Sequence, residues 1–302
     1  MKIGFVGLGK VGYAFTKYLI SHNANNNFRI VLFSRNNIKT KEIANELDVE
    51  FCDNIMDLVI QSDCVMITTN DENIQDVVKK ISDCDLTDKT FIHCSGALSS
   101  ELFSPLIKKG ALGYSLHPLQ AFIGDNSDLL GLNKCYLTIE GNDKNRKPES
   151  NQDYPIDKIL ELFKDRYSWI EMQQKALYHA AAVVISNYSV TLIHEGYKYL
   201  SQIGFNEDEM IKMMYPLMLG TMNNIRRKGT VDSLSGPIIR GDQETIQNHI
   251  TNIESFVGAD EMEFYKLMGL KTIKMIKDKR IDDITYDELE NTFTRERRNK
   301  NE

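Results

Sequence analysis

The chain has 302 residues, 42% of them hydrophobic and 26% charged, a composition typical of a folded protein with room for two domains. Its formal net charge of -7 excludes a broad basic surface for nucleic acid. The cysteines form no CxxC pair, so we expect no disulfide framework, no metal site and a reducing compartment. The start has no signal-peptide pattern and no apolar run reaches the roughly 18 residues of a membrane span, so we expect a cytoplasmic protein without membrane association.

Short apolar segments alternate with helical ones through the first half of the chain. Strands are predicted at residues 2–6, 28–33, 64–68, 90–94, 136–139 and 167–171. This alternation predicts an α/β fold with a doubly wound, Rossmann-type parallel sheet over residues 1–172. A polar stretch at about 142–155, without apolar periodicity, is interpreted as a surface insertion.

The pattern changes to helical spacing at residue 173. Helices are predicted over residues 175–202, 206–227, 243–253 and 260–277, with Asp242 capping the third. The first of them is hydrophobic on nearly all sides, which predicts that it is buried. We therefore expect a second, all-helical domain over residues 173–294, followed by a polar tail at 295–302.

A glycine-rich turn joins the first strand to the helix after it. Gly7 permits a tight turn, Gly9 lets the backbone approach a pyrophosphate, and Gly12 allows the helix to pack closely on the strand. The helix N-terminus supplies amide donors and a positive dipole to phosphates. The expected cofactor-binding residues of this turn are Gly7, Leu8, Gly9, Lys10, Val11 and Gly12.

The end of the second predicted strand indicates which dinucleotide binds. An acidic residue there would bind the ribose 2'-hydroxyl of NAD, but this chain has Ser34 and Arg35, which suit the 2'-phosphate of NADP. The alternative is that Arg35 is a solvated residue at a strand end. Thr69, Asn70 and Asp71 end a later strand and are expected to contact the ribose or nicotinamide, although an ordinary turn would have the same sequence.

Several further motifs occur in order along both predicted domains. They are HCSGAL at 93–98, LHPLQAF at 116–122, KxxYHAA from Lys175 onward through Asn187, and SGPIIRGD at 235–242. With the glycine turn they make the chain resemble the Rossmann-like NADP oxidoreductases that carry a C-terminal domain of unknown function. These proteins are related to ketopantoate reductase, pyrroline-5-carboxylate reductase and 6-phosphogluconate dehydrogenase.

The resemblance implies a Rossmann domain joined to a helical domain like that of 6-phosphogluconate dehydrogenase, commonly a homodimer through its helices. It implies NADPH as the cofactor and a small molecule as the substrate, without identifying that substrate. Two features depart from the family pattern: Ala121 stands where threonine is usual, and the polar insertion precedes Pro155. Ala121 puts the shape of the pocket in doubt.

The candidate catalytic residues lie at the start of the helical domain. Lys175 and His179 are four residues apart and share one helix face, where related reductases place their catalytic helix. Histidine is the side chain that most often transfers protons near neutral pH, so His179 is the first choice for proton donor. Lys175 is expected to polarise a carbonyl or bind a carboxylate, and Asn187 to orient the substrate. The order of the two roles stays open, and both residues also fit a purely structural function.

A second group of residues is expected to line the substrate pocket. Ser95 and Gly96 follow a strand whose carboxyl end faces the ligand crevice of an open α/β sheet, and His117 and Gln120 are expected beside it. Arg240 either binds a substrate carboxylate or is held by Asp242.

Together these features predict an NADPH-dependent oxidoreductase that reduces a small carbonyl or imine compound bearing a carboxylate. Two alternatives remain at this point. One is a non-catalytic NADP(H)-binding sensor, and the other is a reductase that couples NADP to a second redox cofactor such as a deazaflavin.

Overall fold

The computed structural model describes residues 1–23, 27–141 and 154–294. Most of the predicted insertion and the whole predicted tail therefore lie outside the described residues. The chain divides into two compact units, Met1–Ser186 and Asn187–Glu302, which are described separately below. The division falls within the long apolar segment, whereas the boundary predicted near Met172 marks the end of the α/β pattern.

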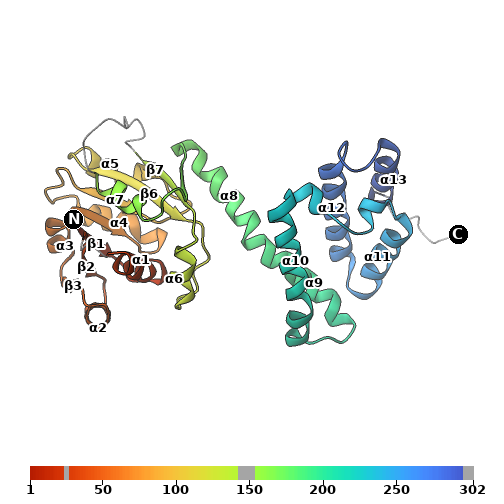
Figure 1. Ribbon diagram of the computed structural model, residues 1–302, viewed down its shortest axis with the longest axis horizontal. Helices are drawn as coiled ribbons and strands as arrows, with labels where there is room; N and C mark the ends of the chain where they lie inside the picture. Colours follow the sequence, from red (N-terminus) through yellow and green to blue (C-terminus); the bar gives the residue numbers. More distant parts are fainter. Residues whose placement is uncertain (24–26, 142–153, 295–302) are drawn as a thin grey trace. The chain divides into compact units, whose positions relative to one another are not determined.

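The first unit is built on an eight-stranded sheet in the order β3-β2-β1-β4-β5-β6-β7-β8 (Figure 1). Its strands are β1 (Lys2–Val6), β2 (Arg29–Phe33), β3 (Glu50–Phe51), β4 (Cys64–Ile67), β5 (Thr90–His93), β6 (Leu112–Pro118), β7 (Leu137–Gly141) and β8 (Tyr167–Trp169). All neighbouring strands are parallel except β6 and β7, which are antiparallel. The predicted fold class is confirmed, whereas β3 and β6 were not predicted as strands.

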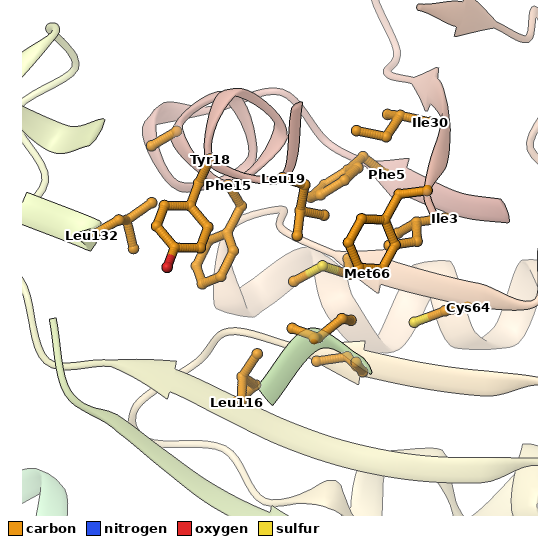
Figure 2. Close-up of a cluster of buried hydrophobic side chains, with 14 of the residues drawn as sticks. Ile3, Phe5, Phe15, Tyr18, Leu19, Ile30, Cys64, Met66, Leu116 and Leu132 are labelled. Atoms are coloured by element: carbon orange, nitrogen blue, oxygen red, sulfur yellow. The ribbon is translucent and has the colours of Figure 1, made fainter. Parts of the chain in front are cut away.

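Helices cover both faces of this sheet. They are α1 (Lys10–Ser21), α2 (Asn37–Leu47), α3 (Ile55–Gln61), α4 (Asp71–Ile81), α5 (Ser104–Ile107), α6 (Ser127–Leu132) and α7 (Pro155–Glu161), with a short 3-10 turn at Ser100–Phe103. A second 3-10 turn, Met172–Gln174, leads into α8 (Lys175–Ile185), in which Lys175 is buried. Successive strand residues point to opposite faces, so Met66 joins one buried cluster and Ile67 the other. Figure 2 shows the first cluster, in which Phe15 and Leu19 of α1 lie over Phe5 of β1. These buried helices and strands hold the glycine turn in place.

The second unit is helical throughout its described residues. It contains α9 (Asn187–Gln202), α10 (Glu207–Ser233), α11 (Gln243–Phe256), α12 (Ala259–Ile276) and α13 (Asp283–Thr294), with a 3-10 turn at Ile238–Arg240. The core is formed where α11, α12 and α13 pack together, around Ile246, Ile273 and Phe293 (Figure 1). The carboxylate of Asp242 accepts a hydrogen bond from the Thr245 N–H, which confirms the predicted cap.

The prediction of one long buried helix over residues 175–202 is wrong in two respects. Helix α8 ends at Ile185 and α9 begins at Asn187. Many apolar side chains of both helices are exposed, among them Leu177 (78%), Ile185 (72%) and Val190 (68%). Apolar composition predicts that a surface will be covered, but the described residues of each helix's own unit leave these side chains exposed.

The same apolar segment also corrects an expectation about membrane spans. Met172–Gln202 has the length and mean hydropathy, 1.4, of a helix that could cross a membrane. Apolar helices that pack against other protein have the same length and hydropathy. These two properties therefore show that Met172–Gln202 is strongly apolar, and no more.

Candidate active site

The glycine turn has the geometry that its sequence predicts. Gly7 has a φ of +99°, a conformation that favours glycine, and its N–H donates to the Phe33 carbonyl at 2.9 Å. A Cβ on Gly12 would lie 2.3 Å from the Gly7 carbonyl oxygen and 2.4 Å from the Thr68 Oγ1. A Cβ on Gly9 would meet no atom within 4 Å. The turn is thus closed towards the sheet at Gly12 and open at Gly9, where a ligand would approach.

A pocket of about 430 Å³ opens beside this turn. Its walls come from the ends of β1, β2 and β4 and from α2 and α4, and they include Gly7, Leu8, Gly9, Ser34, Arg35, Asn36, Lys39, Thr69, Asn70, Asn73, Asp76 and Lys80. The pocket has the size of a small-molecule site and lies at the carboxyl ends of the strands. It contains most of the predicted cofactor residues, and it adds Lys39 and Lys80, which motif reasoning missed.

The side chains in this pocket fit a phosphorylated dinucleotide. Arg35 is exposed, and Lys39 lies one helical turn further on in α2. The Ser34 hydroxyl is already bonded to the Thr40 hydroxyl at 2.6 Å, so it supports the start of α2. Within the part of the chain that the structure describes, the buried Oγ1 of Thr69 has no hydrogen-bond partner, which leaves it available to a ligand in the pocket.

A second polar cluster continues from the end of β4. Asn70 lines the cofactor pocket, and the carboxylate of the next residue, Asp71, accepts a hydrogen bond from the Ser95 hydroxyl at 2.7 Å. The same hydroxyl accepts hydrogen bonds from the N–H groups of Ala97 and Leu98, at 3.2 and 3.0 Å. Ser95 therefore holds the loop after β5 next to the cofactor pocket.

Lys175 is the buried charge of this cluster. Its side chain comes from the first turn of α8, is 2% exposed, and donates a hydrogen bond to the Ser115 hydroxyl on β6. The Ser115 hydroxyl in turn donates to the Ser95 carbonyl at 3.3 Å. Burial lowers the pKa of Lys175 from its ordinary value to about 8, opposed mainly by the negative charge of Glu140. An ammonium with this pKa is still protonated at neutral pH and is a stronger acid than an exposed lysine.

Histidines from two strands border the same cluster. The His93 ring accepts the Ser95 N–H at Nδ1 and donates from Nε2 to the Ser99 carbonyl, so it fixes the loop after β5. The His117 Nδ1 lies 2.7 Å from the hydroxyl of Tyr178. Burial and the charge of Lys175 lower the pKa of both histidines to about 4. Neither imidazole can therefore supply a proton near neutral pH.

His179 and His117 converge on Gly96. A Cβ on Gly96 would lie 2.6 Å from the His179 Nδ1 and 2.8 Å from the His117 Nε2, so only glycine fits there without displacing a ring. The two imidazoles stand nearly perpendicular, with centroids 6.0 Å apart. The Nδ1 of His179 is buried, faces Gly96 and has no hydrogen-bond partner among the described residues.

The structure thus brings together Lys175, His179, Ser95, Gly96 and His117, all within the first unit. The other three predicted site residues have different surroundings. Gln120 donates to the Asp128 carbonyl at 2.9 Å and lies against Gly131 of α6, which points to a role in that loop.

Asn187 and Arg240 belong to the second unit, and their predicted roles at the site stay predictions. Asn187 is the first residue of α9. Arg240 is exposed and has its Nη2 3.9 Å from the Asp242 carboxylate, which fits the second of its two predicted roles.

Three members of the cluster were not found by sequence reasoning: Ser115, Glu140 and Tyr178. Tyr178 lies inside the KxxYHAA motif, directly before His179, so its spacing was a usable signal. Ser115 and Glu140 face each other across the β6–β7 ladder, a pairing that only the strand register reveals. No group of three or more His, Cys, Asp or Glu side chains that could hold a metal ion occurs among the described residues.

Comparison with known families agrees with this architecture. Residues 2–96 match the family model described as NADP oxidoreductase coenzyme F420-dependent, and residues 135–272 match that of a domain of unknown function, DUF2520. The chain is therefore an NADP-dependent oxidoreductase. It joins an NADP-oxidoreductase domain to a DUF2520 domain, which confirms the resemblance that its motifs indicated. No curated protein sequence matches the chain significantly.

Solved structures share the fold over almost the whole chain. Protein TM1727 from Thermotoga maritima is 25% identical, with a TM-score of 0.70, over 90% of this chain and 97% of the other. A reductive aminase from Aspergillus terreus in complex with NADPH and ethyl-5-oxohexanoate is 14% identical, with a TM-score of 0.62, over 94% and 96%. An imine reductase from Myxococcus stipitatus in complex with NADP+ is 12% identical, with a TM-score of 0.60, over 95% and 98%.

Proposed function

We propose that this oxidoreductase uses NADPH to reduce the C=O or C=N bond of a small compound, one that carries a carboxylate. The observation that supports the proposal most directly is the buried Lys175 ammonium, which the Ser115 hydroxyl links to the Ser95 carbonyl. Ser95 in turn donates to Asp71, the residue after Asn70 of the cofactor pocket. Reduction of a carbonyl or imine requires a proton at the oxygen or nitrogen as hydride reaches the carbon. The reductive aminase and imine reductase that share the fold act on the same class of bond.

In this proposal each residue of the cluster has a separate role. Bound NADPH supplies the hydride. Lys175 supplies the proton, because one of its three N–H groups is used by Ser115 and two remain. The Nδ1 of His179, which faces Gly96, binds the reacting oxygen or nitrogen. The sequence favoured His179 as the proton donor. The burial of the Lys175 ammonium and its lowered pKa favour Lys175 in that role. The two assignments predict different dependences of kcat on pH.

A second candidate function follows from the description of the family model over residues 2–96, which names coenzyme F420. In that case the partner of NADP would be a deazaflavin instead of a small carbonyl or imine compound. A substrate screen that includes a deazaflavin separates the two reactions. A sensor without catalysis would bind NADPH and turn over neither.

Replacing Arg35 with alanine is expected to raise the Kd of NADPH by about 10- to 100-fold, because a charged hydrogen bond contributes about 1.5–3 kcal/mol. The Kd of NADH, which lacks the 2'-phosphate, should not change. Fluorescence titration of both nucleotides measures the effect. Arg29→Ala is the matched control, because it removes an exposed arginine at the start of β2, the strand that Arg35 follows. Selective binding of NADPH would justify a screen of keto acids and imines, whereas failure to bind either nucleotide would contradict the proposal.

We also propose that the protein is a homodimer through its helices. The exposed apolar side chains of α9 and α10 include Tyr188, Val190, Leu192, Tyr215, Leu217 and Leu219. Apolar patches of this extent usually mark an interface. Light scattering after size exclusion should give about twice the 34.6 kDa mass of one chain. Val190→Lys should weaken the dimer and the exposed control Gln247→Lys should not; a monomeric mass for the unaltered protein would contradict the proposal.

A further inference from the structure

A buried carboxylate lies behind the candidate active site. Glu140 on β7 is 1% exposed, and both its oxygens are bound by Ser100: Oε2 accepts the backbone N–H at 2.8 Å and Oε1 accepts the hydroxyl at 2.6 Å. Taking a carboxylate out of water costs several kcal/mol unless a positive charge compensates for it. Both donors on Ser100 are neutral, so the compensating charge must come from elsewhere.

The pairing of strands β6 and β7 shows that the compensating charge is the Lys175 ammonium. Glu140 is the antiparallel partner of Ser115, and the side chains of such partners lie on the same face of a sheet. The Ser115 hydroxyl accepts a hydrogen bond from the Lys175 ammonium. The Glu140 carboxylate and the Lys175 ammonium are therefore both held at the Ser115–Glu140 pair of the β6–β7 ladder. Each is bound by a serine hydroxyl, the carboxylate by that of Ser100 and the ammonium by that of Ser115.

The other titratable groups around Lys175 do not replace Glu140. Burial raises the pKa of the Cys94 thiol to about 12 and, with the charge of Lys175, lowers the pKa of His93 and His117 to about 4, so all three are uncharged at pH 7. Asp71 also acts on Lys175, but its carboxylate is engaged by the Ser95 hydroxyl and its effect on the pKa is smaller than that of Glu140.

We propose that Glu140 is a positioning residue for Lys175: its carboxylate, fixed by Ser100, balances the buried ammonium and keeps it protonated beside Ser115. The consequence for catalysis rests on the proposed function of Lys175 as the acid. The charge coupling itself does not, because it can be measured without any substrate.

Glu140→Gln tests the coupling, since glutamine preserves the shape and can still accept the Ser100 N–H while removing the charge. The pKa of Lys175 is followed by NMR on protein with 13C-labelled lysine, and the Lys175 signal is identified by its loss in Lys175→Met. We expect Glu140→Gln to lower this pKa by about one to two units from about 8. Ser100→Ala perturbs the same buried contacts but keeps the charge, so it should leave the pKa within a few tenths of a unit of the original value.

An unchanged Lys175 pKa in Glu140→Gln, or an equal fall in Ser100→Ala, would overturn the inference. If Glu140→Gln does not fold, the double variant with Lys175→Met, which removes both charges, should fold; failure of the double variant would also overturn it. Once a substrate is known, the fall of kcat at alkaline pH should move to lower pH in Glu140→Gln. A shifted pKa in a protein that reduces no compound would support the coupling while contradicting the proposed function.

Discussion

Replacing Lys175 with methionine is expected to lower kcat by about 10²- to 10⁴-fold, the usual contribution of a positioned acid or base. Methionine fills the buried space of the lysine stem without the charge. NADPH binding should be unchanged within about twofold, because Lys175 does not line the cofactor pocket. Steady-state kinetics and a nucleotide titration on the same protein measure both quantities.

The pH dependence identifies the donor. The acid must be protonated to act, so kcat should be constant below pH 7 and fall as the pH rises through about 8, the pKa of Lys175. In Lys175→Met this alkaline fall should disappear from the remaining activity. His179→Gln should reduce kcat but keep the fall near pH 8. If His179→Gln removes the fall and Lys175→Met keeps it, His179 is the donor; unchanged turnover in His179→Ala would exclude any catalytic role for that residue.

Gly12→Ala is expected to abolish measurable NADPH binding and to lower the free energy of unfolding by about 1–3 kcal/mol. The added methyl group would lie 2.3 Å from the Gly7 carbonyl oxygen, a backbone atom that cannot rotate away. Helix α1 must therefore move off the sheet, which displaces its N-terminal amides. Urea unfolding and NADPH titration measure the two effects.

Gly9→Ala is the control for this prediction. Its methyl group meets no protein atom within 4 Å, so stability should be unchanged while NADPH binding weakens, because the backbone can no longer approach the pyrophosphate. If both variants kept the free energy of unfolding and the NADPH affinity of the unaltered protein, the glycine turn would not be where the nucleotide binds.

Much of the Rossmann-type unit could be predicted because its central strands are uninterrupted apolar runs. Strand β6 was missed because the polar residues Ser115 and His117 interrupt its run of apolar residues. The exposure of α8 and α9 could not be predicted, since an apolar sequence does not say whether the same chain or another molecule covers it.

The candidate site was predictable where its residues share one helix or one motif. Lys175 and His179 were found from their spacing, and Ser95 and Gly96 from their place after a strand. Glu140 was not, because its relation to Lys175 depends on the pairing of two strands about 25 residues apart and on a helix 35 positions later. The local pattern of residues 137–141 is that of an ordinary strand.

The position of the ammonium has a consequence for how such a protein diversifies. The cofactor pocket, Lys175 and its counter-charge all lie within Met1–Ser186, each held by contacts inside that unit. Under the proposed function, the source of reducing power and the strength of the acid are thus properties of one unit. Substitutions that preserve the contacts within Met1–Ser186 are therefore expected to leave both properties unchanged, wherever else in the chain they fall.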